Sequence, residues 1–286
     1  MASTYNDLYL DTRQELRQAG VAAAQLEARE LLCFAADKSR EQLYRDMPLY
    51  APDHIARRFR ELVDRRLAGE PVAYIIGEWE FYGITLDICR DVLIPRPDTE
   101  TLVERGIDFV RELPEGTRVL DLCAGSGCVG LAVAHHCPRT RVILAEWSED
   151  ALRVCRQNIR RCGLTARVST TRVDALEPAP SALWDFDLIV CNPPYIPSGD
   201  IAALEASVRD YEPHLALDGG EDGLDFYRAV AAGWKSALRP GGKLCFEVGF
   251  DQAPDVELIL GEQGYEDIVT TPDAAGRWRV VEGILN

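Results

Sequence analysis

The stretch Val119-Leu-Asp-Leu-Cys-Ala-Gly-Ser-Gly-Cys-Val-Gly130 decides the fold of this chain. Its apolar start predicts a buried strand that ends at Leu122, and the residues from Cys128 onward predict a helix. The glycines between them predict a tight turn, and Gly125–Gly130 fits the G-x-G-x-x-G pattern that lets a nucleotide-like ligand approach the backbone. The pattern alone also fits a purely structural turn, so its function depends on the residues around it.

Apolar runs alternate with helical patterns from Arg118 onward, which predicts a parallel sheet with helices on both faces. The predicted strands are 119–122, 142–145, 168–173, 188–191 and 243–248. A predicted helix near 254–263 precedes two further apolar runs, 265–269 and 278–285. The short segment between these two runs predicts an antiparallel hairpin. The fold class is therefore α/β.

Two other regions precede this sheet. Residues 1–75 place apolar side chains three and four positions apart, which predicts a small helical bundle. Residues 76–95 change to a two-residue alternation of apolar side chains, which predicts a β-hairpin that links two domains. The remaining domain, 96–286, begins with a helix that we expect Asp98 or Thr99 to cap.

The composition limits the class of protein. A chain of 286 residues with 47% hydrophobic and 27% charged residues is typical of a globular protein and excludes a fibrous or disordered one. It has no long uninterrupted apolar run, and no basic-then-apolar secretory leader is recognisable at its start. Nine cysteines without a C-x-x-C pair, together with four scattered histidines, argue against a disulfide framework and a metal site. We therefore expect a cytoplasmic protein with no metal and no membrane contact.

The negative charge is unevenly distributed. Residues 1–75 carry a net charge of −1, whereas residues 76–286 carry −15 of the total of −16. Nucleic acid is a polyanion, and proteins that bind it need a basic track. Because the chemical motifs lie in the acidic part, no direct contact with nucleic acid is expected.

Carboxylates near the glycine turn indicate which cofactor it holds. A dinucleotide would bring its pyrophosphate beside Asp121 and be repelled, whereas the sulfonium and ammonium groups of S-adenosylmethionine would be attracted. Glu146 ends the second predicted strand, where a carboxylate can accept both ribose hydroxyls. Asp174 follows the third strand, and its carboxylate or a neighbouring backbone N–H is placed to meet the adenine edge. The alternatives are a turn brace at Asp121, an acidic first-turn residue at Glu146 and a surface acid at Asp174.

The segment Asn192-Pro-Pro-Tyr195 follows the fourth predicted strand, at the edge of the sheet where ligands bind in such folds. The two prolines remove two N–H donors, so the Asn192 and Pro193 carbonyls and the Asn192 side-chain oxygen offer acceptors only. Tyr195 adds an aromatic wall. This arrangement suits a planar group that carries an NH₂, and a rigid turn with an asparagine cap is the plainer alternative.

At this motif the chain resembles methyltransferases that modify planar nitrogens: adenine N6, cytosine N4 and the glutamine side-chain amide. Together with Leu93-Ile-Pro-Arg-Pro-Asp-Thr-Glu100, Asn192–Pro197 and Glu212-Pro-His-Leu-Ala-Leu-Asp-Gly-Gly220, it resembles the HemK/PrmC family along essentially its whole length. Within the first segment, Arg96 and Glu100 are interpreted either as an ion pair behind the site or as a plain hairpin-to-helix brace.

The resemblance implies a Rossmann-like class I S-adenosylmethionine-dependent methyltransferase sheet, an antiparallel C-terminal hairpin and a small N-terminal helical bundle. We expect this bundle, residues 1–75, to dock the substrate protein, because its near-neutral charge lacks the repulsion expected between two acidic proteins. The resemblance also implies transfer of a methyl group from S-adenosylmethionine to the amide nitrogen of the glutamine in the Gly-Gly-Gln loop of peptide-chain release factors. The catalytic candidates are Asn192, Pro193 and Tyr195, and Pro194 joins them in binding substrate. The cofactor candidates are Asp121, Cys123, Ala124, Gly125, Ser126, Gly127, Glu146, Asp174, Ala175 and Asn192.

The chain departs from the family pattern at a few positions. Cys123 stands where glycine is common, Glu146 where aspartate is usual, and Ala175 where some members have tryptophan, so stacking of an aromatic side chain at 175 on adenine is not expected. Two alternatives to glutamine methylation stay open. Asn192–Tyr195 alone does not separate an amide from adenine N6 of nucleic acid, and a non-catalytic or NAD-dependent Rossmann module would leave that segment without a purpose.

Overall fold

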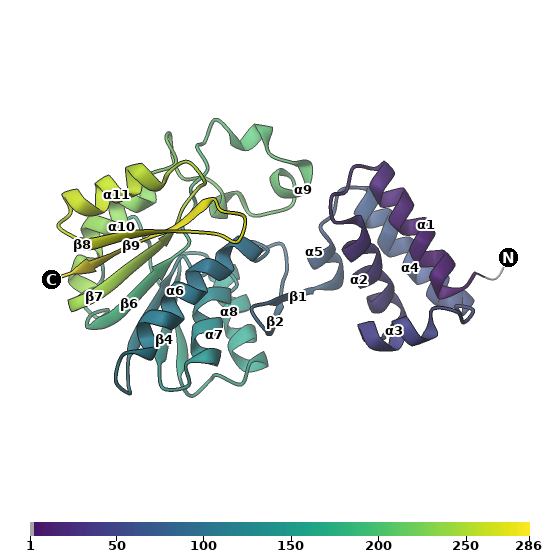
Figure 1. Cartoon of the computed structure of the whole chain (residues 1–286), viewed down its shortest axis with the longest axis horizontal. Helices are drawn as coiled ribbons and strands as arrows, with labels where there is room; N and C mark the ends of the chain where they lie inside the picture. Colours follow the sequence, from purple (N-terminus) through teal and green to yellow (C-terminus); the bar gives the residue numbers. More distant parts are fainter. Residues whose placement is uncertain (1–2) are drawn as a thin grey trace. The chain divides into compact units, whose positions relative to one another are not determined.

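The computed structural model describes residues 3–286 and divides the chain into two compact units, Met1–Gly77 and Glu78–Asn286 (Figure 1). Each unit buries its own hydrophobic cluster, as independently cored domains do. Within residues 3–286, no helix has the length and apolar character needed to cross a bilayer.

The first unit is helical, as predicted. Thr4 and Ser39 start two of its helices with reciprocal capping boxes, in which the N3 residue returns a hydrogen bond to the cap backbone. Leu16 is completely buried and packs with small alanines of the next helix, which lets the two helices approach closely. The helices are α1 (Tyr5–Gln18), α2 (Ala24–Ala36), α3 (Arg40–Asp46), α4 (Asp53–Leu67) and α5 (Val72–Ile76).

The second unit contains a seven-stranded sheet in the order β5-β4-β3-β6-β7-β9-β8. The first five strands in this order, β5, β4, β3, β6 and β7, pair in parallel with their neighbours. Strand β9 pairs antiparallel with both β7 and β8. The predicted α/β class and the antiparallel hairpin are therefore confirmed. The strands are β3 (Arg118–Leu122), β4 (Arg141–Glu146), β5 (Val168–Arg172), β6 (Phe186–Cys191), β7 (Leu238–Glu247), β8 (Glu266–Pro272) and β9 (Trp278–Leu285).

Helices cover both faces of this sheet (Figure 1). On one face α6 lies so close to β6 that a Cβ at Gly106 would be 3.5 Å from Leu188 and Val190. On the other face the buried Tyr227 and Trp234 pack with Phe246 of β7 in the main core. The first face carries α6 (Glu100–Arg111), α7 (Cys128–His136) and α8 (Glu149–Arg161), and the second carries α10 (Asp225–Gly233) and α11 (Ala253–Glu262).

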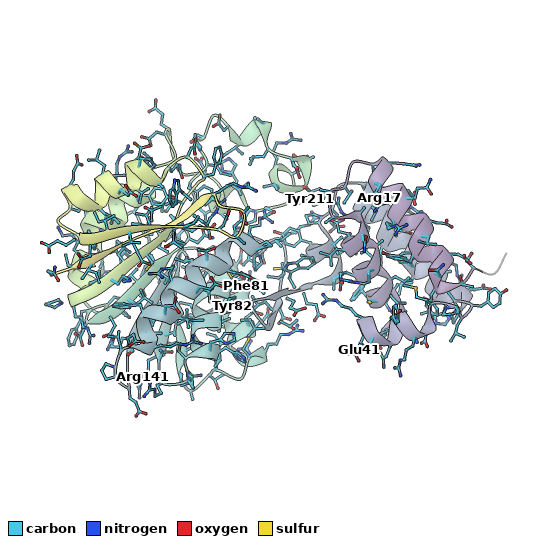
Figure 2. The ribbon with its side chains drawn as sticks, viewed as in Figure 1. Arg17, Glu41, Phe81, Tyr82, Arg141 and Tyr211 are labelled. Carbon is cyan, nitrogen blue, oxygen red and sulfur yellow. The ribbon has the colours of Figure 1, made fainter. Side chains whose placement is uncertain are left out.

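Short turns complete the second unit: η1 (Pro97–Thr99), η2 (Ile201–Ala203), α9 (Ala206–Arg209), η3 (His214–Ala216) and η4 (Lys235–Ala237). A small hairpin, β1 (Glu78–Phe81) with β2 (Ile84–Asp87), also belongs to this unit. At its turn, Phe81 is buried and Tyr82 meets the His136 ring edge-on at 5.1 Å between ring centroids (Figure 2). The Asp87 N–H donates to Asn158 Oδ1 of α8 at 2.6 Å, which fixes the hairpin against the sheet domain.

The order of the parallel strands reverses between β3 and β6. From β3 the chain moves outward to β4 and β5, and it then returns to β6 and continues to β7 on the other side. In open α/β sheets the crevice outside the carboxyl ends of the strands at such a reversal is where ligands bind. Residues that directly follow β3 and β6 are thereby brought together.

Candidate active site

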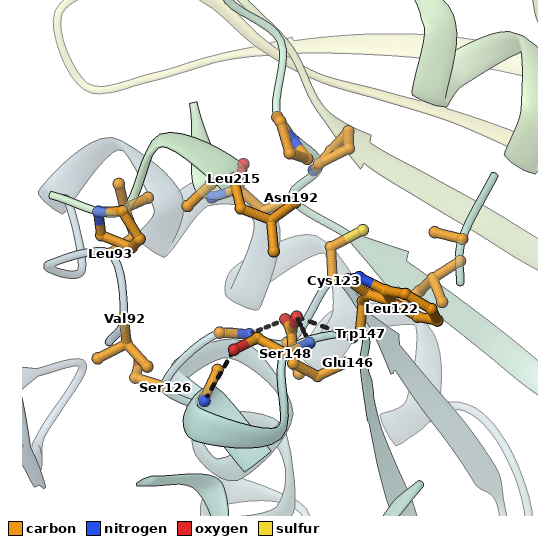
Figure 3. Close-up of a pocket in the computed structure, with 18 of the residues that line it drawn as sticks. Val92, Leu93, Leu122, Cys123, Ser126, Glu146, Trp147, Ser148, Asn192 and Leu215 are labelled. Carbon is orange, nitrogen blue, oxygen red and sulfur yellow. Dashed lines mark hydrogen bonds between the residues drawn. The ribbon is translucent and has the colours of Figure 1, made fainter. Parts of the chain in front are cut away.

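A cavity of about 340 Å³ lies at the carboxyl ends of the five parallel strands, entirely within the second unit (Figure 3). Its volume is in the range of small-ligand pockets. Its charged lining is mostly acidic, because among residues 3–286 it holds one basic residue, Arg96, beside five acids: Asp91, Asp121, Glu146, Asp174 and Glu247. The remaining predicted site residues also line it, except Gly127: Cys123, Ala124, Gly125, Ser126, Ala175, Asn192, Pro193, Pro194 and Tyr195.

The glycine turn forms one wall of the cavity. Cys123, Gly125 and Gly127 all have positive φ, at 63°, 54° and 81°, so the chain reverses through conformations that favour glycine. Gly127 does not line the cavity, and a Cβ there would lie 2.8 Å from the Leu144 side chain. Glycine at this position therefore allows α7 to pack closely against β4.

Asp121 lies at the base of this wall and is almost completely buried. Its Oδ2 accepts a hydrogen bond from the Gly130 N–H of α7 at 2.8 Å, so it braces the turn as the structural alternative predicted. Burial raises the pKa of Asp121 to about 7, although the hydrogen bond from Gly130 favours the ionised form. Asp121 also lines the cavity. Its structural role is therefore compatible with the predicted attraction for a cationic ligand, which stays a prediction.

Glu146 ends β4 and accepts hydrogen bonds from backbone N–H groups at both of its oxygens (Figure 3). Gly125 donates to Oε2 at 2.9 Å, and Trp147 and Ser148 donate to Oε1 at 2.8 and 2.9 Å. A carboxylate offers about four acceptor positions. Simultaneous acceptance from two ribose hydroxyls, as predicted from the sequence, therefore requires one backbone donor to give way.

Asp174 and Ala175 form the next wall, directly after β5. Asp174 Oδ1 accepts from the Leu176 N–H at 3.0 Å, which closes an Asx turn. The Ala175 carbonyl accepts from the indole N–H of the buried Trp234 at 3.1 Å. These two bonds fix the backbone of the segment, and they leave both residues on the cavity wall.

Asn192 follows β6 directly, and its Nδ2 donates to the Thr99 hydroxyl oxygen at 3.4 Å. The loop behind it is firmly held. Gln252 Nε2 donates to the Tyr195 carbonyl at 2.9 Å, and a Cβ at Gly219 or Gly223 would lie 2.7 or 2.4 Å from the Tyr195 backbone. The segment around Gly219 and the Asn192–Tyr195 loop therefore pack backbone to backbone, which explains the glycines there.

Two cavity residues, Thr99 and Glu247, were not among the predicted site residues. Thr99 occupies the N-cap position of α6, which was one of the two predicted, but its side chain makes no capping hydrogen bond, and Asp98 lies within the preceding 3₁₀ turn. The Thr99 hydroxyl serves Asn192 instead. Glu247 ends β7 and is 1% exposed, and its Oε2 has no hydrogen-bond partner within residues 3–286. Burial raises the pKa of Glu247 to about 7, while hydrogen bonding to Thr99 opposes that shift.

Of the two interpretations of Arg96 and Glu100, the ion pair between them is wrong, whereas a hairpin-to-helix brace is present at Glu100. The Arg96 guanidinium forms an ion pair with the buried Glu212, whose Oε2 accepts from the Ile94 N–H at 3.3 Å. Glu100 Oε1 accepts instead from the Tyr82 N–H at 3.4 Å. The partner of Arg96 thus lies 116 positions along the chain, in the segment that packs on the Asn192–Tyr195 loop.

Comparison with known proteins places this site in a family. Residues 7–77 match the PrmC N-terminal domain, and residues 104–220 match the methyltransferase small domain. The chain is 43% identical over 276 residues to the release factor glutamine methyltransferase of Geobacter sulfurreducens, a match that covers 95% of this chain and 93% of that protein. The chain belongs to the release factor glutamine methyltransferase family. The resemblance noted in the sequence is thereby confirmed.

A second member of the release factor glutamine methyltransferase family, from Moorella thermoacetica, is 40% identical over 267 residues, which are 93% of each chain. The fold extends beyond the family. The hMettl16 catalytic domain, solved in complex with the MAT2A 3'UTR hairpin 6, has a TM-score of 0.59 and 16% identity over 79% of this chain and 82% of that one. That likeness shows a shared fold alone.

Proposed function

We propose that this chain transfers the methyl group of S-adenosylmethionine to the side-chain amide nitrogen of the glutamine in the Gly-Gly-Gln loop of peptide-chain release factors. The observation that carries the proposal is Asn192-Pro-Pro-Tyr195 on the wall of the cavity, in a chain 43% identical to a release factor glutamine methyltransferase. The two prolines leave the wall without N–H donors at the point where a substrate NH₂ needs acceptors.

The charge of the cavity lining supports this cofactor. S-adenosylmethionine carries a sulfonium and an ammonium group, and the lining holds Asp121, Glu146 and three further acids against Arg96. A pyrophosphate-containing dinucleotide would meet the same acids unfavourably. Asp121 and the Gly125 turn are the residues that would hold the amino-acid part, and Glu146, Asp174 and Ala175 the nucleoside. The cofactor supplies an electrophilic methyl group.

The chain itself has to orient a poor nucleophile. An amide nitrogen shares its lone pair with the carbonyl group, so its reaction depends on geometry. In this proposal Asn192 Oδ1 and the Pro193 carbonyl accept the two amide hydrogens, which leaves the lone pair free on one face. Holding the two reactants in the correct geometry can lower the activation free energy of a bimolecular reaction by about 7 to 11 kcal/mol. The same acceptors stabilise the positive charge that develops on the nitrogen.

The rim of the cavity suits a protein loop better than a phosphate backbone. Trp147, Leu176 and Leu215 line the cavity and are each about half exposed, so they offer apolar contact at its entrance. With Arg96 as the one basic lining residue, the entrance has little to offer a polyanion.

We further propose that residues 1–75 dock the body of the release factor. Three large apolar side chains of this region are exposed within a short segment: Tyr44, Leu49 and Tyr50. The net charge of −1 there lacks the repulsion that the acidic second unit would impose on an acidic partner. A second contact would raise the effective concentration of the glutamine loop at Asn192.

Methyl-labelled S-adenosylmethionine tests the proposed activity. The chain is incubated separately with a release factor, with the same factor carrying Gln→Ala in its Gly-Gly-Gln loop, and with DNA or RNA. Label in the first substrate alone, with a gain of about 14 Da on the loop glutamine expected from the added CH₂, supports the proposal. Label in nucleic acid would favour adenine N6 methylation, and no labelling would contradict both.

A further inference from the structure

Thr99, Glu247 and Asn192 meet at one wall of the cavity although they lie far apart in the sequence. Thr99 precedes α6, Asn192 follows β6 and Glu247 ends β7. Because β6 and β7 are parallel neighbours, with Cys191 opposite Phe246, the residues that follow these two partners lie side by side. Thr99 and Glu247 are each 1% exposed, so their polar atoms have to find partners within the protein.

The number of hydrogen bonds that the Thr99 hydroxyl can donate and accept determines the direction of its hydrogen bonds to Glu247 and Asn192. A hydroxyl has one hydrogen to donate and lone pairs with which to accept. The Glu247 carboxylate lies close enough to the Thr99 side chain to interact with it, and its Oε2 has no hydrogen-bond partner within the described residues, so it is open to accept the Thr99 hydrogen. An ionised carboxylate only accepts, so the Thr99 hydrogen goes to Glu247. The Thr99 oxygen is then left to accept, and it does so from Asn192 Nδ2 at 3.4 Å.

This direction determines which end of the Asn192 amide faces the substrate. The NH₂ group is turned toward Thr99, so Oδ1 is turned away from it. We propose that Thr99 and Glu247 form a hydrogen-bonded relay that holds the Asn192 side chain with its oxygen toward the incoming amide. Thr99 and Glu247 are positioning residues because they act through Asn192. The inference rests on the proposed function, in which Oδ1 accepts a hydrogen of the substrate amide.

The relay needs Glu247 in its ionised form, and burial opposes that form because it raises the pKa of Glu247 to about 7. Arg279 and Arg96 lie near enough to lower the pKa of Glu247, whereas burial and the charge of Asp98 raise it. Arg279 is itself buried and holds Asp98 at 3.1 Å. The relay carboxylate thus has positive charge nearby, which stabilises it without replacing Thr99 as its hydrogen-bond donor.

Thr99 variants test the relay in the full-length chain. Thr99→Val removes the hydroxyl at nearly constant volume and should lower kcat about tenfold, which corresponds to one lost hydrogen bond to a charged network. Thr99→Ser keeps the hydroxyl and should retain kcat within about twofold. The KM for S-adenosylmethionine should stay unchanged in both.

Thr140→Val is the matched control, because the Thr140 hydroxyl is equally buried but donates to the Cys137 carbonyl at 2.8 Å, away from the cavity. Equal loss in the valine and serine variants, or none in either, would overturn the proposal.

Glu247→Gln tests the direction of the relay. Glutamine both donates and accepts, so the Thr99 hydroxyl can turn and donate to Asn192 Oδ1, and we expect kcat to fall severalfold. In an Asn192→Asp background both outer atoms are acceptors, so Thr99→Val should then have little further effect on the residual rate. A full tenfold effect of Thr99→Val in that background would mean that Thr99 does not act through Asn192.

A spectroscopic measurement separates this inference from the proposed function. The chain has four asparagines, Asn6, Asn158, Asn192 and Asn286, so ¹⁵N-asparagine labelling gives few side-chain amide signals. The Asn192 NH₂ should exchange slowly with solvent in the wild type and about fivefold faster in Thr99→Val, as expected when a hydrogen bond of net strength near 1 kcal/mol is lost. Unchanged exchange overturns the relay even if release factors are methylated. Changed exchange supports the relay even if the substrate proves to be another amide.

Discussion

Buried carboxylates occupy two regions of the second unit, the cavity wall and the antiparallel part of the sheet. The two regions differ in how many hydrogen bonds and ion pairs offset the buried negative charge. On β9, Glu282 accepts from Arg105 at 2.7 and 3.0 Å and from Lys243 at 2.8 Å. On the cavity wall, Asp121 is held by one backbone N–H, and Glu247 leaves Oε2 without a partner within residues 3–286. All three carboxylates are at most 2% exposed.

The difference in compensation changes the direction of the pKa shift. Burial raises the pKa of each carboxyl, but in Glu282 the bonds from Arg105 and Lys243 overcome it and the pKa is lowered. In Asp121 and Glu247 burial prevails and the pKa is about 7. Breaking a compensated buried ion pair strongly destabilises a fold, whereas an uncompensated buried charge costs stability and is typical of functional sites. The antiparallel part of the sheet therefore resembles a structural ion-pair network, and the cavity wall resembles a functional site.

The largest effect is expected at the cavity. Asn192→Ala removes the side chain that we propose accepts from the substrate amide, and it should lower kcat about 100- to 1,000-fold, as the loss of one preorganised polar group in an active site does. Cofactor binding, measured by isothermal titration, should change much less, because the acceptor acts on the substrate. Near-normal turnover of the variant would show that orientation by Asn192 is not the source of the rate.

A change in the antiparallel part of the sheet should instead alter the stability of the fold. Glu282→Ala leaves Arg105 and Lys243 without their shared partner and should lower the free energy of unfolding in urea by about 3 to 5 kcal/mol. Asp108→Ala is the matched control, because Asp108 pairs with the same Arg105 at 3.7 Å but is exposed, and its loss should cost under about 0.5 kcal/mol. A small effect of Glu282→Ala would mean that its burial cost cancels its ion pairs.

The pH dependence of this stability follows from the lowered pKa of Glu282. Because the folded-state pKa is below that of the unfolded chain, the carboxylate stabilises the fold above the unfolded pKa. That contribution is lost as pH falls through the folded-state pKa. Asp121 acts in the opposite sense, because its pKa rises from 3.8 to about 7 on folding and its burial destabilises the fold as pH increases between these values.

Cofactor affinity should also depend on pH through Asp121. With a pKa of about 7, this carboxyl is mostly neutral at pH 6 and mostly ionised at pH 8. The Kd for S-adenosylmethionine should therefore decrease about tenfold across that interval, since the ionised form attracts the cation. In Asp121→Asn most of this pH dependence should be lost, and what remains is assigned to Glu247, whose pKa is also about 7. An undiminished pH dependence in the asparagine variant would assign the titration to another group.

The smallest effect concerns the first unit, which contains no part of the cavity. A Tyr44→Ser, Tyr50→Ser double variant should raise the KM for an intact release factor about fivefold, near the 1 kcal/mol typical of contributing interface residues. Its KM for a Gly-Gly-Gln peptide should not change. Leu258→Ser is the control, because Leu258 is similarly exposed but lies on α11 of the second unit. Equal effects on factor and peptide would contradict docking.

Most of the fold could be predicted from local patterns in the sequence. The run Leu188–Cys191 becomes the inner part of β6 because it is buried on both faces, and such strands consist of continuous apolar residues. The same logic located Asn192, because a polar residue at the end of a buried strand lies at the ligand-binding edge of the sheet. Glu247 carries that signal too, at the end of the apolar run 243–248, and could have been found by it.

Thr99 could not be found in this way. A threonine before a predicted helix is indistinguishable from an N-cap in sequence, and its actual partner, Asn192, is 93 positions away. The partner of Arg96 escaped prediction for the same reason, because Glu212 and Glu100 are equivalent acids until the chain is folded. Side-chain pairs between distant segments depend on tertiary packing, and no local pattern encodes them.

The position of β9 has a consequence for how the protein is made. This strand follows β8 in sequence but lies between β7 and β8 in the sheet. During synthesis β7 therefore presents one unpaired row of N–H and C=O groups until residues 278–285 have emerged, and unpaired edges promote association with other chains. Slowing translation after residue 272 should prolong that exposure, and the newly made chain would then depend more heavily on chaperones that shield open strands.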